Sequence, residues 1–174
     1  MSKKSSAEYG TKSLHTRLND GTKRYRSGTC GGNMRKVMIS IKGTPVPTEN
    51  EDSSFELMTD GEYLWKDGVS TFSYVESELT GLDGLLTTFD VEPDRVILKR
   101  GGELSGEMIF SEKQKHHFLY ETPFGSIMMG IDTHSIKKNM RDDGGSLEIR
   151  YDIEVDNVSV SRNLFQINIR SLPQ

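Results

Sequence analysis

The sequence predicts an all-β protein, a single antiparallel up-and-down barrel of about eight to ten strands. From Met34 onward, apolar and polar residues alternate in short runs, as in strands with one buried face. Clusters rich in Gly, Asp and Asn separate these runs, and no segment keeps a helical period. A long series of such strands must close into a barrel or fold into two sheets to avoid open edges. The short connections favour the barrel over a two-sheet sandwich.

The strands and their turns can be placed in order along the chain. Lys66-Asp67-Gly68-Val69 is typical of a hairpin with a two-residue primed turn, and turns are also expected at Asp142–Gly145 and Asp156-Asn157. Near the end the alternation changes parity, which predicts a β-bulge near Arg162-Asn163. The alternating runs lie at residues 37–42, 55–65, 72–78, 82–88, 96–99, 108–110, 116–120, 127–133, 147–155 and 158–170.

Two regions of opposite charge divide the chain. Residues 1–33 hold seven Lys/Arg against two Asp/Glu, a net charge of +5, and show no sustained apolar period. We therefore expect residues 1–33 to be a disordered basic leader, since they cannot bury enough surface to offset the entropy of ordering. The leader is interpreted as an extension from an upstream start codon or from cloning, with Met34 as the original first residue. Residues 34–174 form the predicted barrel domain.

The composition argues against several classes of protein. Residues 34–174 hold fifteen Lys/Arg against twenty-four Asp/Glu, a net charge of −9, which disfavours binding to nucleic acid. Cys30 is the only cysteine, so no internal disulfide can form. No apolar run is long enough for a membrane span or a secretory signal. We expect a cytoplasmic protein with no membrane insertion.

Several stretches resemble one known family. Residues 34–43, Lys66-Asp67-Gly68, the run Tyr74–Thr88, residues 120–125 and Asn168-Ile169-Arg170 are similar, in order, to the YwiB-like bacterial family of uncharacterised proteins. The resemblance covers Met34 to Arg170 and leaves out residues 1–33. It implies a calycin-like barrel, related in shape to lipocalins, and no established activity. The Gly-x-Trp signature of lipocalins is absent, because Tyr63 precedes Trp65 where that glycine would stand.

One strand carries an unusual face. Every second residue from Phe72 gives Phe72, Tyr74, Glu76 and Glu78 on one side. Two carboxylates so placed could share acid and base roles in a hydrolase, provided that burial raises one pKa. The simpler interpretation has both carboxylates at the barrel rim, solvated or paired with Arg or Lys. We rank the hydrolase last and expect no catalytic residues.

Other polar residues are expected on inward faces, where they form either a ligand site or an ordinary core network. His116 shares the parity of the aromatic residues on its strand, so it is expected to face inward. His117 and His134 do not complete a set of metal ligands with His116, so no metal or cofactor is predicted. The candidate lining residues are Tyr74, Glu76, Glu78, Thr88, His116, Tyr120, Thr122, Thr133 and Tyr151.

Two functions of different classes follow. The first is a protein that binds a small apolar or amphipathic ligand inside the barrel. The second is a protein–protein interaction module with a filled barrel, which includes a homo-oligomer. A barrel of this strand number is wide enough for side chains alone or for one small ligand, so the packing of the interior separates the two.

Overall fold

The computed structural model describes residues 34–45, 54–78, 83–101, 106–122 and 125–172, without the side chains of residues 120–122. All of these belong to one compact unit, residues 31–174. The predicted leader, with Cys30, lies outside the described residues. Within the described ranges, no helix is long and apolar enough to cross a membrane.

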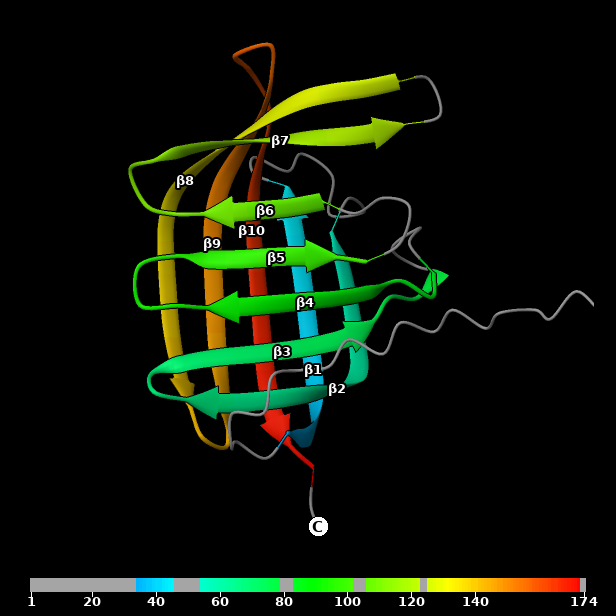
Figure 1. The fold of residues 1–174 in the computed structure, drawn as a ribbon, viewed down its shortest axis with the longest axis vertical. Helices are drawn as coiled ribbons and strands as arrows, with labels where there is room; N and C mark the ends of the chain where they lie inside the picture. The colour runs from blue at the N-terminus through cyan, green and yellow to red at the C-terminus, as the bar shows by residue number, and fades with distance from the viewer. Residues whose placement is uncertain (1–33, 46–53, 79–82, 102–105, 123–124, 173–174) are drawn as a thin grey trace, which may run out of the picture. The chain divides into compact units, whose positions relative to one another are not determined.

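The unit is an all-β, nearly closed antiparallel barrel, which confirms the predicted fold class. Strands β3 to β6 run across β8, β9 and β10 in Figure 1. Each strand is short or bent enough to follow the curvature of the barrel. The strands are β1 (Arg35–Pro45), β2 (Phe55–Lys66), β3 (Val69–Val75), β4 (Leu86–Val91), β5 (Val96–Arg100), β6 (Gly106–Phe110), β7 (Lys115–Thr122), β8 (Gly125–Arg141), β9 (Gly144–Val155) and β10 (Val158–Ser171).

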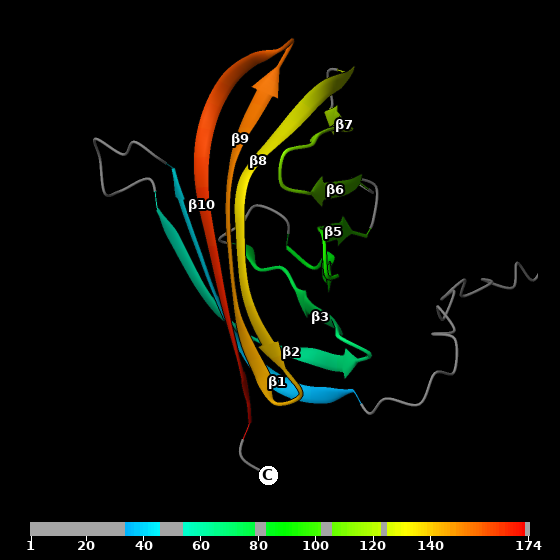
Figure 2. The same cartoon turned by 90° about the vertical axis from the view of Figure 1, so that its left-hand side faces the viewer.

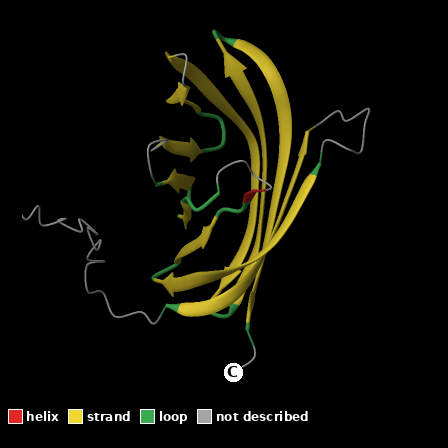
Figure 3. Ribbon diagram, turned by 90° about the vertical axis from the view of Figure 1, so that its right-hand side faces the viewer, coloured by secondary structure: helices red, strands yellow, loops and turns green. Residues whose placement is uncertain are grey.

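The topology is up-and-down with one seam. The ten strands hydrogen-bond in the order β6-β5-β4-β3-β2-β1-β10-β9-β8-β7, so the first strand pairs with the last. β6 and β7 are the two ends of this order, joined by a tight turn with one bridge between Ser111 and Gln114. Figure 2 shows β8, β9 and β10 as a long curved wall with β5, β6 and β7 on its concave side. Figure 3 shows how completely strands dominate; Glu78 is the one helical residue in the described ranges.

Tight hairpins set the register of the strands. Asp67 and Gly68 both have positive φ, 51° and 81°, as a primed two-residue turn requires, and Lys66 pairs with Val69. Asp156 and Asn157, with φ of 51° and 63°, make the same kind of turn between β9 and β10. Both predicted hairpins are confirmed. Asp and Asn tolerate this left-handed conformation better than other non-glycine residues.

The irregularities of the long strands differ from the prediction. The register of β10 against β9 shifts between Ser159 and Ser161, which places the bulge at Val160 rather than near Arg162-Asn163. The prediction was wrong by a few residues because the apolar pattern reverses over several residues and does not show which one is extra. A second irregularity lies between Thr133 and Ser135 in β8, where the core-facing positions change parity from Ile131 to Ile136 and Met140.

Apolar and aromatic side chains fill one part of the barrel. Phe72 and Phe89 stack with ring centroids 4.8 Å apart, and Phe89 stacks on Phe165 at 6.0 Å. These rings link β3 and β4 with β10 on the opposite wall. Ile149 pairs with Phe165 and is fully buried, so this part of the interior has the close packing of a protein core.

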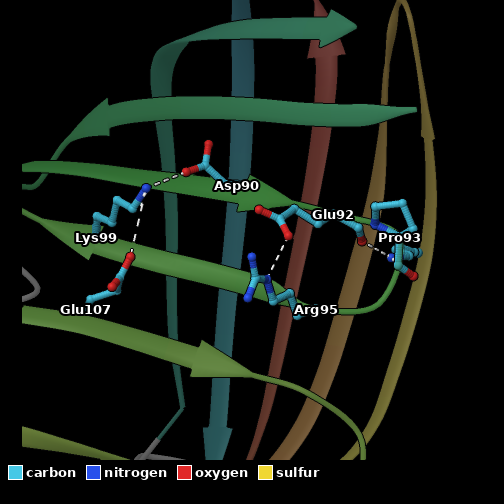
Figure 4. Close-up of polar contacts among 7 residues, drawn as sticks. Asp90, Glu92, Pro93, Arg95, Lys99 and Glu107 are labelled. Atoms are coloured by element: carbon cyan, nitrogen blue, oxygen red, sulfur yellow. Dashed lines mark hydrogen bonds and ion pairs between the residues drawn. The ribbon is translucent and has the colours of Figure 1, made fainter. Parts of the chain in front are cut away.

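The outward positions of the same strands carry ion pairs. Lys99 on β5 contacts Asp90 on β4 at 2.8 Å and Glu107 on β6 at 3.9 Å. Arg95 contacts Glu92 at 2.7 Å across the β4–β5 turn (Figure 4). Charged side chains outside and apolar side chains inside produce the strict alternation seen in the sequence.

Candidate functional site

Glu76 is a buried carboxylate inside the barrel. It follows β3 directly and is only 3% exposed. Its backbone N–H donates to the Leu85 carbonyl at 2.8 Å, and the Gly84 N–H donates to the Glu76 carbonyl at 3.1 Å. These two hydrogen bonds continue the pairing of β3 with β4 beyond the last strand residue. The backbone therefore holds the carboxylate on the inner face with Tyr74.

Three strands bring partners to Glu76. Thr87 Oγ1 donates to Glu76 Oε1 at 2.6 Å, Tyr74 OH donates to the same oxygen at 3.2 Å, and Arg100 Nε lies 3.8 Å from it. Tyr74 pairs with Thr87 across β3 and β4, and Thr87 pairs with Arg100 across β4 and β5. The register of the sheet therefore places these side chains in one row, which we call the Glu76 cluster: Tyr74, Glu76, Thr87 and Arg100.

The environment keeps the tyrosines protonated. Burial, reinforced by the negative charge of Glu76, raises the pKa of Tyr74 far above its usual value. Burial also raises the pKa of Tyr151, and the positive charge of Arg100 partly opposes that rise. Tyr74 is therefore a hydroxyl donor at neutral pH, consistent with its hydrogen bond to Glu76.

A second group of polar side chains lies on the opposite wall. Thr133 on β8 pairs with Tyr151 on β9, and His116 on β7 pairs with Ile131, two residues from Thr133. Tyr151 packs edge-on against Phe110 of β6, with ring centroids 5.0 Å apart. This ring contact brings β6 and β9 together at this level of the barrel.

Several buried polar atoms of the interior lack a hydrogen-bond partner among the described residues. They are Glu76 Oε2, Arg100 Nε, Thr133 Oγ1 and His116 Nε2. A buried polar group without a hydrogen bond costs about 1–3 kcal/mol, so such atoms are rare in a finished core. These four atoms are therefore the hydrogen-bonding positions that the described part of the interior leaves open.

Inward-facing apolar side chains near these atoms are only partly covered. Alternation places Met108 on β6, Phe118 on β7, Met129 on β8 and Ile153 on β9 on the inner face, yet each is half-buried. Ile131, one step further into the barrel, is fully buried. Met108 lies in the same cross-strand row as Phe72 and Phe89, so the partly covered apolar surface adjoins the stacked phenylalanines as well as the polar groups.

Not all the residues predicted from the sequence come together. Glu78 is exposed beyond the end of β3, and Thr88 lies on the outer face, because Thr87, Phe89 and Val91 are the buried residues of β4. Tyr120 and Thr122 lie in β7, but their side chains are outside the described part of the structure. The remaining predicted residues, namely Tyr74, Glu76, His116, Thr133 and Tyr151, all lie on the inner face.

Two residues of the cluster were missed by the sequence reasoning. Thr87 has the parity of Phe89 and Val91, and Arg100 has the parity of Val96 and Leu98. Counting back from the apolar residues of each strand would have found both. The alternation of β4 and β5 therefore predicts that Thr87 and Arg100 face inward, but it does not predict that they contact Glu76.

The geometry does not bring two carboxylates together. Glu76 is buried and paired with Arg100, whereas Glu78 is exposed. Among the described side chains, no three His, Cys, Asp or Glu gather closely enough to hold a metal ion. The chemistry that this site offers is hydrogen bonding in an enclosed, partly apolar setting.

Comparison with known proteins supports the fold. The ywiB protein from Bacillus subtilis has a crystal structure similar to this chain, with a TM-score of 0.69 and 20% sequence identity over 82% of this chain and 96% of that one. At that identity, the likeness shows the fold alone. No curated protein matches the sequence.

The family follows from the sequence itself. Residues 39–167 match the family described as a domain of unknown function, DUF1934. This range takes in every strand from the middle of β1 to the middle of β10. Because the match covers most of the chain and the fold is that of ywiB, the protein belongs to the DUF1934 family, and the predicted YwiB-like resemblance is confirmed.

Proposed function

We propose that this protein binds a small apolar or amphipathic molecule inside the barrel, with the polar end of the molecule at the Glu76 cluster. The observation that supports it is the group of buried polar atoms without partners, which adjoins half-covered apolar side chains. Ligand sites in proteins combine an apolar lining with a few convergent polar groups in this way. The stacked phenylalanines fill the neighbouring part of the barrel, so the ligand is small.

Native mass spectrometry after gentle purification tests the proposal. We expect a co-purified molecule on the wild-type protein and its loss from Glu76→Leu, because leucine leaves Tyr74 and Thr87 without their acceptor. Glu92→Gln is the matched control, since Glu92 lies on the outer face with Arg95. A wild-type protein that carries no molecule and binds no apolar dye would contradict ligand binding.

A second function has one observation in its favour. Leu119 on β7 and Met128 on β8 pair across the strands, and both are exposed on the outer face beside the end of the hydrogen-bonded order. Exposed apolar side chains next to an end strand favour contact with another chain. If the protein is an interaction module or a homo-oligomer, Met128→Lys should lower the mass measured by light scattering on a sizing column. An unchanged monomer mass for both proteins would remove the homo-oligomer.

A further inference from the structure

The charges inside the barrel limit what the ligand's polar end can be. Glu76 and Arg100 form a pair at 3.8 Å, and Glu76 is almost completely buried. His116, Tyr74 and Tyr151 are further titratable groups of this region among the described residues, while Lys138 on β8 donates to the carbonyls of Glu92 and Pro93 at the β4–β5 turn. The carboxylate and the guanidinium cancel each other. A charged ligand would add a charge without a partner to a buried site, which is costly.

The vacant hydrogen-bonding positions are of two opposite kinds. Glu76 Oε1 already accepts from Tyr74 and Thr87, but Oε2 accepts from none of the described groups. Arg100 Nε carries a hydrogen that makes no hydrogen bond there. An ionised carboxylate only accepts and a guanidinium only donates. Because both oxygens belong to one carboxylate and Oε1 lies 3.8 Å from Nε, one small group can reach Oε2 and Nε together.

Resting on the proposed function, we infer that the ligand has an uncharged head group with both a donor and an acceptor, such as a hydroxyl or a primary amide, on an apolar body. The donor of the head group serves Glu76 Oε2, and its acceptor serves Arg100 Nε. A carboxylate head would satisfy Arg100 but would place a second negative charge beside Glu76. An ammonium head would satisfy Glu76 and meet the positive charge of Arg100.

The apolar body has a place beside the head group. Met108 on β6 and Phe118 on β7 face inward on the two strands of the seam, and Met129 on β8 and Ile153 on β9 face inward on the strands that follow; all four are partly uncovered. Thr133 Oγ1 lies on the same wall and offers a further hydrogen bond to a hydroxyl or an amide. The seam is where the ladder of backbone hydrogen bonds is interrupted, so a ligand can enter there without breaking a strand pair.

A panel with one chain length and four head groups tests the inference: octanol, octanamide, octanoate and octylamine. Each compound displaces an uncharged fluorescent dye, N-phenyl-1-naphthylamine, from the full-length protein at pH 7. We expect octanol and octanamide to bind at least about tenfold more tightly than the two charged compounds, since a buried polar group left unpaired costs about 1–3 kcal/mol. Octanoate or octylamine as the tightest ligand would overturn the inference while leaving ligand binding intact. Failure of the dye and of all four compounds would instead overturn the proposed function.

Two variants test whether the preference for an uncharged head group depends on Glu76 and Arg100. Glu76→Gln leaves the partly exposed Arg100 as the one charged side chain of the cluster, and we expect the preference of this variant to move to octanoate. Arg100→Gln leaves Glu76 as the one charged side chain of the cluster, and the preference of this variant should move to octylamine. If circular dichroism shows that Glu76→Gln does not fold, the Arg100→Gln variant tests the inference in its place. Glu92→Gln on the outer face should keep the wild-type order. The same order of affinities in all the folded variants would overturn the assignment of the head group to Glu76 and Arg100.

Discussion

Gly61 lies inside β2, where the chain passes close to two neighbours. A Cβ atom at this position would lie 2.3 Å from Ile39 Cδ1 and 2.6 Å from the Ser73 carbonyl oxygen. The tip of Ile39 can move aside, but the carbonyl of Ser73 belongs to β3 and cannot move without disturbing the sheet. Glycine here lets β1, β2 and β3 curve tightly around the core.

We therefore expect Gly61→Ala to lower the free energy of unfolding by about 1–3 kcal/mol, the usual cost of overpacking a well-packed interior. Urea denaturation measures this change. The matched control is Gly101→Ala, because a Cβ at Gly101 would lie 3.7 Å from its nearest neighbour, the Leu86 carbonyl. Equal stability of the two variants would show that the close approach at Gly61 is relieved at little cost.

Asp152 is a second residue whose surroundings decide its behaviour. On the outer face it accepts hydrogen bonds from Arg162 Nε at 3.0 Å and lies 2.9 Å from His134 Nε2. Burial alone would raise the pKa of Asp152, but the hydrogen bonds from Arg162 and His134 outweigh burial and hold the pKa below its usual value. The folded state therefore favours the ionised carboxylate.

The stabilisation by Asp152 should depend on pH in a defined direction. Because the folded-state pKa is the lower one, the stabilisation is complete above the unfolded-state pKa of about 4 and is lost as the pH falls through the folded-state pKa. Asp152→Asn should cost about 0.5–1 kcal/mol at neutral pH, the range of partly solvated ion pairs, and much less in acid. Thermal unfolding across the pH range measures it, with Asp83→Asn in the exposed turn before β4 as control. A cost that stays constant into acid would contradict the ionic origin.

At the scale of elements, β8 is a long strand that contacts two turns of the barrel in addition to its neighbouring strands. Its 17 residues run from β7 past the full height of β9, with an irregularity between Thr133 and Ser135. Past that point, Ile136 N donates to Glu112 Oε1 at 2.7 Å, and Lys138 reaches the β4–β5 turn. The hydrogen bond from Ile136 to Glu112 thus connects the irregular part of β8 to the β6–β7 turn. This connection keeps Thr133 directed into the barrel while the strand bends.

The Glu112→Ala variant tests the role of this hydrogen bond. We expect a loss of about 0.5–1.5 kcal/mol in stability, the net value of one hydrogen bond, with faster amide exchange at Ile136 in particular. Hydrogen exchange followed by NMR resolves that amide. The control is Glu107→Ala, which removes an exposed carboxylate that pairs with Lys99 instead. If the Ile136 amide exchanges no faster in Glu112→Ala than in the control, Glu112 does not secure the bend.

At the scale of the whole molecule, the hydrogen-bonded order of the strands predicts where the barrel opens. β2, β1 and β10 lie in the middle of the order, and β6 and β7 lie at its ends. End strands have one partner instead of two, and local opening begins where few contacts hold a segment.

Hydrogen–deuterium exchange of the intact protein should show this gradient. We expect the slowest exchange in β1, β2 and β10 and the fastest strand exchange in β6 and β7. A ligand bound at the Glu76 cluster should slow exchange in β5, β6 and β7, since its apolar body would lie beside the seam. Exchange that is as slow in β6 and β7 as in β1 would show that the seam is closed in solution.

Much of the fold could be predicted from the sequence because its signals are local. Alternation identifies the buried face of each strand, and Asp67-Gly68 and Asp156-Asn157 mark turns through their own conformational preferences. The same local rule placed Phe72, Tyr74 and Glu76 on one face, as the structure has them.

The site needed the tertiary structure. Thr87 could have been found from the parity of Phe89 and Val91, but nothing local shows that the chain leaves the strand before Glu78. The bulge at Val160 and the irregularity in β8 depend on pairing with β9 rather than on the residues themselves.

By itself, then, the sequence determined an all-β barrel and the inward or outward direction of most side chains, because a strand repeats every two residues whatever its neighbours are. Only the tertiary structure decided that Glu76 meets Arg100, because that contact depends on the register of β3, β4 and β5. Register across strands is set by long-range packing and hydrogen bonding, which no single stretch of sequence contains.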